Sequence, residues 1–226
     1  MGRLRSVLQT YRTWYHRLNE TQQKLFVHRV KKFVKGKRFL GRSVKVTDEL
    51  KVLVSSAAVQ ISLGLKKYML PHFKTIILYP DSYFSHISGR YHQGEVHLGG
   101  AIVLSVDDFM KGMQDPGDGF NTGIHEFAHA LYFENFIQNE DYLFIDRKEF
   151  AEWHGEAGAY MAKVASGAAD FIRTYAADNV QEFFAVSTEH FFEQPMAFSE
   201  HLPHLYARMC KLFNQDPAAT LALHRA

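Results

Sequence analysis

Residues 125–129 read His-Glu-Phe-Ala-His, within a stretch, 121–137, that we expect to be a helix. Apolar residues at positions 124, 127, 128 and 131 follow the i, i+3, i+4, i+7 spacing of a helix face that packs in a core. His125 and His129 are four residues apart, so they lie one turn apart toward the other side. The same helix is therefore predicted to organise the core and to present two imidazoles.

The H-E-x-x-H pattern is typical of zinc metallopeptidases. Two imidazoles one turn apart can bind one zinc ion, with Zn–N distances of about 2.0–2.1 Å. Glu126 projects beside the first histidine, where it can reach water that the zinc activates. The competing interpretation is an ordinary helix with two structural histidines. We favour the metal site, with His125 and His129 as ligands and Glu126 as the catalytic base.

A catalytic zinc typically has three protein ligands, so one more must come from elsewhere in the chain. The extended pattern H-E-x-x-H-x-x-G-x-x-H is excluded, because Tyr132 occupies the glycine position and Asn135 the third histidine position. The single cysteine, Cys210, excludes a cysteine cluster. A glutamate on a helix after residue 178 is the main alternative. Spacing alone does not choose among three candidates, which are Glu182, Glu189 and Glu193.

Helix geometry limits these candidates in one respect. Residues 182 and 189 are seven apart, so their side chains face the same way on a helix. If Glu182 is a ligand, we expect Glu189 to lie nearby as a partner of a ligand histidine. The competing interpretation of Glu182 is a helix-terminal carboxylate, because Asn179-x-x-Glu182 resembles a capping box.

The remaining pattern predicts a mostly helical chain with a few strands. Residues 1–70 should be helical, with one helix from a Thr21 cap to Lys35 and a second starting at Thr47 or Asp48. Residues 75–79 should form a strand. Residues 87–104 should form a hairpin or meander that turns at 93–94 and has a bulge or close backbone approach at the glycine pair 99–100. Residues 107–119 should form a loop able to cover the cleft. Further helices are expected over 147–165, from 178, and from Pro203 to 216–217.

We therefore expect one α+β domain over residues 1–226, mostly helical with a small mixed or antiparallel sheet. Residues 1–70 would form a basic helical N-terminal segment and residues 71–226 the catalytic core. The length of 226 residues is near the upper end for one domain, and 46% hydrophobic residues suffice for a substantial core. Neither a membrane span nor a secretory signal is visible, and the longest apolar stretch is 52–65. We expect a cytoplasmic protein, and leave open an N-terminal anchor outside this sequence.

Charge is distributed unevenly along the chain. Residues 1–45 hold 13 of the 26 Lys and Arg residues but only one of the 24 acidic residues, Glu20. Such a segment can contact an anionic surface. The interpretation we favour is a solvated helix face on an acidic body, and no nucleic-acid partner is expected.

Two stretches resemble the Mlc titration factor A family of zinc peptidases. One is residues 125–131, and the other is residues 175–192, which contain the run Glu-Phe-Phe-Ala-Val from 182. Weaker support comes from residues 76–80, 103–105 and 213–217, so the resemblance covers roughly 70–217. The resemblance implies a zincin-like catalytic core with one Zn²⁺ per chain. It also implies Glu182 as the third zinc ligand and Tyr175 as a catalytic tyrosine.

The resemblance also implies a function, namely aminopeptidase-type hydrolysis of peptides. A strand within 95–104 could align an extended peptide, by analogy with related metallopeptidases. The alternative is a zinc-containing regulatory protein that sequesters a transcriptional repressor and hydrolyses weakly, because the family includes a member that binds one. A third interpretation is an adaptor for anionic surfaces through residues 1–45. The intact Glu126 favours the enzyme, since a purely structural zinc site has no need of a base.

Overall fold

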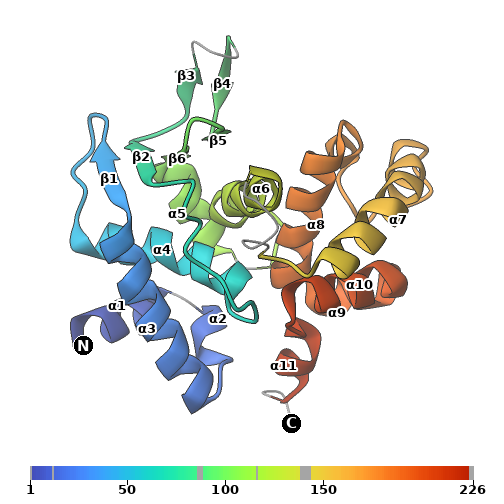
Figure 1. Cartoon of the computed structure of the whole chain (residues 1–226), viewed down its shortest axis with the longest axis horizontal. Helices are drawn as coiled ribbons and strands as arrows, with labels where there is room; N and C mark the ends of the chain where they lie inside the picture. The colour runs from blue at the N-terminus through green and yellow to red at the C-terminus, as the bar shows by residue number, and fades with distance from the viewer. Residues whose placement is uncertain (1, 12, 86–88, 116, 138–143, 224–226) are drawn as a thin grey trace.

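The computed structural model describes residues 2–11, 13–85, 89–115, 117–137 and 144–223. The fold is α+β and mostly helical, with a small mixed sheet, as the sequence predicts (Figure 1). From the N-terminus to the last strand, the elements are α1 (Gly2–Tyr11), α2 (Thr13–His16), α3 (Glu20–Gly36), β1 (Arg38–Gly41), α4 (Asp48–Ser62), β2 (Thr75–Tyr79), β3 (Tyr83–Ser85), β4 (Arg90–His92), β5 (Gly94–His97) and β6 (Ala101–Ser105).

Helices dominate the rest of the chain. They are α5 (Val106–Gln114), α6 (Thr122–Ile137), α7 (Arg147–Ala165), the 3₁₀ helix η2 (Thr174–Ala177), α8 (Val180–Glu193), α9 (Pro195–His201), α10 (Pro203–Phe213) and α11 (Pro217–Leu223). The strand predicted at 75–79 and the helix predicted at 147–165 have the predicted bounds. The helix predicted to end at 216–217 ends earlier, and Pro217 instead begins α11.

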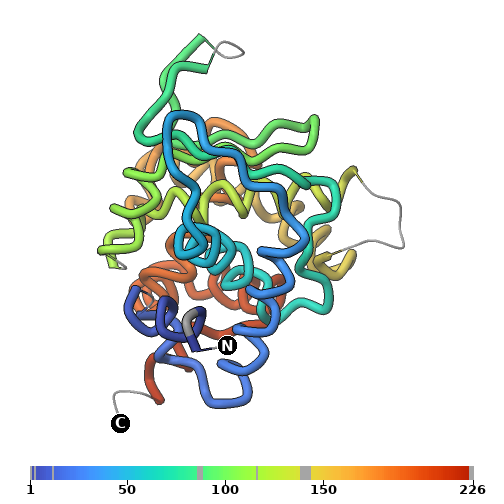
Figure 2. Tube along the Cα trace, turned by 90° about the vertical axis from the view of Figure 1, so that its left-hand side faces the viewer, coloured from blue at the N-terminus to red at the C-terminus, as the bar shows by residue number. Residues whose placement is uncertain are grey.

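Four strands form the main sheet in the order β1-β2-β6-β5. β1, β2 and β6 are parallel, whereas β5 pairs antiparallel to β6 and lies at the edge. The glycine pair 99–100 is not a bulge, because it lies in the turn between β5 and β6, where Gly100 has φ +96°. The close backbone approach predicted there is confirmed, since a Cβ atom on Gly100 would lie 2.8 Å from the backbone oxygen of His72. The separate hairpin β3–β4 projects beyond the rest of the molecule (Figures 1 and 2).

Three further predictions for local structure are wrong. Residues 107–114 are helical rather than a loop, because the Ser105 hydroxyl caps α5 by accepting from the Asp108 backbone N–H. The N-terminal 70 residues include the strand β1, and the cap of α3 is Asn19 rather than Thr21. Asn19 and Gln22 form a reciprocal capping box there.

Helix α6 lies near the middle of the fold, between the sheet and α8 (Figure 1). It contacts α8, α4, β5 and β6. The N-terminal helices share this core, since the rings of Phe33 on α3 and Phe127 on α6 meet edge to face with centroids 5.9 Å apart. Among the helices that the structure describes, none combines the length and apolar character needed to cross a membrane.

Candidate metal centre

Asn121 fixes the start of α6 and ties it to α8. Its side-chain oxygen accepts from the backbone N–H of Ile124 at 2.9 Å, as an N-cap does. Its backbone N–H donates to Glu189 at 2.7 Å, and its side-chain amide donates to Glu193 at 2.8 Å. The first turn of the motif helix is therefore held against the helix that carries the candidate third ligand.

The structure brings His125, His129 and Glu182 together. The Nε2 atoms of the two histidines are 3.0 Å apart. One carboxylate oxygen of Glu182 lies 3.3 Å from Nε2 of His125, and the other lies 3.4 Å from Nε2 of His129. One potential ligand atom from each residue falls within 4.8 Å of the other two. Glu193 instead binds Asn121, so it does not join this group.

Glu189 lies behind the group, as expected from its seven-residue spacing. Its Oε1 accepts from Nδ1 of His125 at 2.7 Å and from Nη2 of Arg173 at 2.6 Å. A carboxylate on Nδ1 fixes the imidazole tautomer and leaves the Nε2 lone pair free for a metal. Arg173 lies with its guanidinium carbon 3.9 Å from the ring centroid of Phe120. The network thus sets both the orientation and the electronic state of His125.

Burial and mutual contacts shift the pKa values of the three residues in different directions. Burial opposes protonation of His125, but the charge of Glu189 and hydrogen bonds to Glu182 and Glu189 outweigh it and raise its pKa to about 10. Burial lowers the pKa of His129. Burial also acts to raise the pKa of Glu182, yet hydrogen bonds from the two histidines hold it well below its usual range. Two nitrogen donors and one ionised carboxylate are a donor set that fits a divalent transition metal.

Glu126 is buried beside this group without belonging to it. Burial raises the pKa of Glu126 to about 8; His125 opposes the shift, while Glu182 and Glu189 add to it. A carboxyl group with such a pKa can both accept and release a proton near neutral pH. Gly94, at the start of the edge strand β5, packs directly against this side chain.

Tyr175 lies on η2, just before α8, and is 39% exposed. It lines the same hollow as His125, Glu126 and Glu189. Its ring centroid is 5.2 Å from the guanidinium carbon of Arg173. Burial, with the charge of Glu189 adding to it, raises the pKa of Tyr175, so its hydroxyl keeps its proton and can donate.

Comparison with known proteins agrees with this geometry. The family model described as glucose-regulated metallo-peptidase M90 matches residues 2–214. The chain belongs to this M90 family. Mlc titration factor A of Escherichia coli is 32% identical over 232 residues, covering 92% of this chain and 84% of that protein. Mlc titration factor A of Cronobacter sakazakii is 30% identical over 228 residues, covering 91% and 84%.

This M90 chain has two hollows at the candidate centre. One, of about 380 Å³, includes Phe120 and Tyr175 in its wall. The other, of about 370 Å³, includes Phe133 and Glu182. His125 and Glu126 line both. Glu126 can therefore be reached from either hollow.

Sequence reasoning missed three residues that shape the centre. Asn121 stands at a helix N-cap, where asparagine is a favoured residue, so its position was a readable signal. Arg173 and Gly94 offered no comparable signal. The contact of Arg173 with Glu189 joins elements whose adjacency the sequence does not show. The sequence predicts only a turn at Gly94, not its contact with Glu126.

Proposed function

We propose that this M90 chain is a zinc-dependent peptidase of aminopeptidase type that acts in the cytoplasm. The convergence of His125, His129 and Glu182 beside a separate buried carboxylate, Glu126, carries the proposal. A structural zinc site usually has four protein ligands. Among the described residues this group offers three, together with a base that is not needed for binding.

The residues of this chain divide the work of hydrolysis. Zinc held by His125, His129 and Glu182 would supply Lewis-acid chemistry, which activates water and polarises a carbonyl group. Glu126 accepts a proton from the attacking water at a carboxylate oxygen and later delivers it to the leaving amine. Tyr175 donates a hydrogen bond to the developing oxyanion. Glu189 keeps the proton of His125 on Nδ1 throughout.

The proposal is tested by metal analysis and peptidase assays on three proteins. Purified wild-type protein should contain one zinc per chain and hydrolyse peptides. Glu126→Gln should keep the zinc and lose hydrolysis, because it removes a base and not a ligand. His129→Ala should lose most of the zinc. Wild-type turnover in Glu126→Gln, or unchanged zinc in His129→Ala, would contradict the proposal.

The aminopeptidase type has a test of its own. Two peptides that differ only in acetylation of the α-amino group should differ strongly in kcat/KM, with the free amine preferred. Equal rates would assign the chain as an endopeptidase, which the two hollows lined by Glu126 also accommodate. That outcome would leave the zinc mechanism intact.

A second candidate is a regulatory protein with weak hydrolysis. It is favoured by the relatives, whose name describes the titration of Mlc. For this candidate, Glu126→Gln should bind purified Mlc as tightly as the wild-type protein does, with hydrolysis near background in both. Absence of binding in a titration by calorimetry would remove this candidate without affecting the first.

A further inference from the structure

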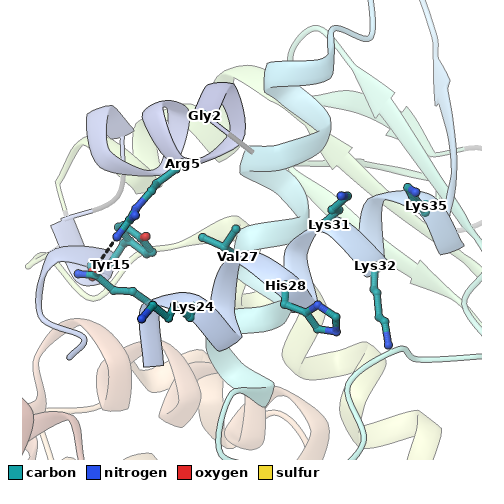
Figure 3. A pocket seen from close by; sticks show the side chains of 10 residues that line it. Gly2, Arg5, Tyr15, Lys24, Val27, His28, Lys31, Lys32 and Lys35 are labelled. Atoms are coloured by element: carbon teal, nitrogen blue, oxygen red, sulfur yellow. Dashed lines mark hydrogen bonds between the residues drawn. The ribbon is translucent and has the colours of Figure 1, made fainter. Parts of the chain in front are cut away.

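A third cavity lies between the first three helices, and its lining residues are distant in sequence from those of the metal centre. It has a volume of about 510 Å³ and shares no lining residue with the two hollows beside Glu126. Its walls come from α1, α2 and α3 (Figure 3). From Gln23 to Lys35 the lining follows thirteen residues of α3, which span about 18 Å of helix. The cavity is therefore an elongated groove, and we call it the α3 groove.

Cations border the α3 groove, and no acidic residue lines it. Lys24 already pairs with Glu20 at 2.7 Å. Lys31, Lys32 and Lys35 are exposed, and among the residues that the structure describes none of them has a carboxylate partner. Arg5 adds a further cation from α1. The basic N-terminal segment therefore places exposed positive charge around a cavity.

The floor of the α3 groove has a different character. Val27 and Tyr15 are buried there, and the aliphatic stems of the lysines extend the apolar surface. The Tyr15 hydroxyl is buried and has no hydrogen-bond partner in the described part of the chain. A buried donor without a partner is unusual in a protein and costs stability.

Charge and shape together select the kind of occupant. A fatty acid carries a single carboxylate, so it would leave most of the cations along these roughly 18 Å (about twelve helical rises) without a partner. Nucleic acid supplies the charge but makes no use of an apolar floor. A lipid surface does not follow a concave groove closely. An amphipathic helix with acidic residues on one side and apolar residues on the other matches the length, the charge and the floor together.

We propose that the α3 groove is a docking site for an acidic amphipathic helix of a partner protein. Apolar side chains of that helix cover Val27 and the lysine stems, while its carboxylates pair with Lys31, Lys32 and Lys35. The site is independent of the metal centre, so binding there requires neither zinc nor Glu126.

A designed peptide tests this proposal on the full chain. The probe is a fluorescein-labelled helical peptide of about 16 residues, long enough to span the groove, with glutamates on one face and leucines on the other. Fluorescence anisotropy should show saturable binding that weakens when salt rises from about 0.15 M to 0.5 M. Lys31→Glu combined with Lys35→Glu should weaken binding on the order of tenfold, because two attractions become repulsions. Thermal unfolding of the double variant should match wild type, since both side chains are exposed.

Matched controls separate this site from general electrostatic attraction. Lys45→Glu combined with Lys74→Glu makes the same charge change at exposed positions outside the α3 groove and should leave binding unchanged. A peptide of identical composition with its apolar face scrambled should bind at least tenfold more weakly. Equal losses in the two double variants, equal binding of the scrambled peptide, or no saturable binding would overturn the proposal. So would binding to phosphatidylglycerol vesicles without binding to the peptide, which would assign the face to a membrane.

Discussion

Gly94 at the start of the edge strand β5 lies against the Glu126 carboxylate. A Cβ atom built on Gly94 would stand 2.6 Å from Oε1 of Glu126, closer than real side chains allow. The absence of a side chain on Gly94 therefore leaves room for the Glu126 carboxylate against the strand. The same contact joins the sheet, where a peptide could align, to the proposed base.

Gly94→Ala should displace the Glu126 carboxylate while leaving the proposed metal ligands in place. A displacement of about 1 Å at a reacting group costs roughly 10²-fold in rate, so we expect kcat to fall by about that factor with zinc content unchanged. Steady-state kinetics with metal analysis measures both. Gly158→Ala on α7 is the matched control, because nothing lies within 4 Å of its added Cβ. Wild-type kcat in Gly94→Ala would show that Glu126 tolerates the shift or is not the base.

Glu182 and Glu189 should contribute differently to zinc affinity. Glu182→Ala removes a proposed ligand and should lose most of the zinc. Glu189→Gln keeps a side chain of the same shape but weakens the hold on His125, which should cost about 10–100-fold in affinity. Competition with a chelator gives both values. A larger loss for Glu189→Gln than for Glu182→Ala would reverse the assignment of ligand and support.

The parts of the centre that the sequence predicted are those encoded by local spacing. A four-residue step places His125 and His129 on one face of α6, and a seven-residue step places Glu182 and Glu189 on one face of α8. Each of these relations lies within one helix, so it does not depend on how α6 and α8 pack against each other. The choice of Glu182 over Glu189 did not follow from spacing, because it depends on how α6 and α8 pack.

The parts that the sequence did not predict depend on tertiary contacts or on weak local signals. β1 has only four residues and is stabilised by parallel pairing with β2, some 35 residues further along the chain. The glycines and proline after residue 114 obscured α5, although Ser105 is a good N-cap. Arg173 reaches Glu189 from outside α8, and no periodicity connects the two.

We expect Arg173 to contribute more to the free energy of unfolding than to the affinity for zinc. Glu189 and Arg173 are both largely buried, and breaking one side of such a pair typically costs 3–5 kcal/mol. Arg173→Met should lower the free energy of unfolding by about that amount in urea titrations, whereas Arg173→Lys should lose less because it keeps the charge. Unchanged stability of Arg173→Met would show that the ion pair is balanced by its desolvation cost.

Tyr175→Phe tests the donor proposed for the oxyanion. Arg173 lies beside the Tyr175 ring, but it lines neither hollow of the centre, its Nη2 donates to Glu189, and its Nε and Nη1 are buried. Tyr175 is partly exposed in the hollow that also contains His125 and Glu126, and it keeps its proton because burial raises its pKa. A phenol that binds only in the transition state affects turnover more than substrate binding.

Loss of one such donor costs roughly 10²–10³ in kcat, so Tyr175→Phe should show that fall with zinc content, folding and KM close to wild type. The phenylalanine ring keeps the contact with Arg173, which separates the hydroxyl from the packing of the ring. Tyr160→Phe on α7 is the control, because it removes a hydroxyl from a tyrosine that lines neither hollow of the centre. A kcat within threefold of wild type would assign Tyr175 to packing alone. Loss of zinc in this variant would show instead that its hydroxyl maintains the architecture of the centre.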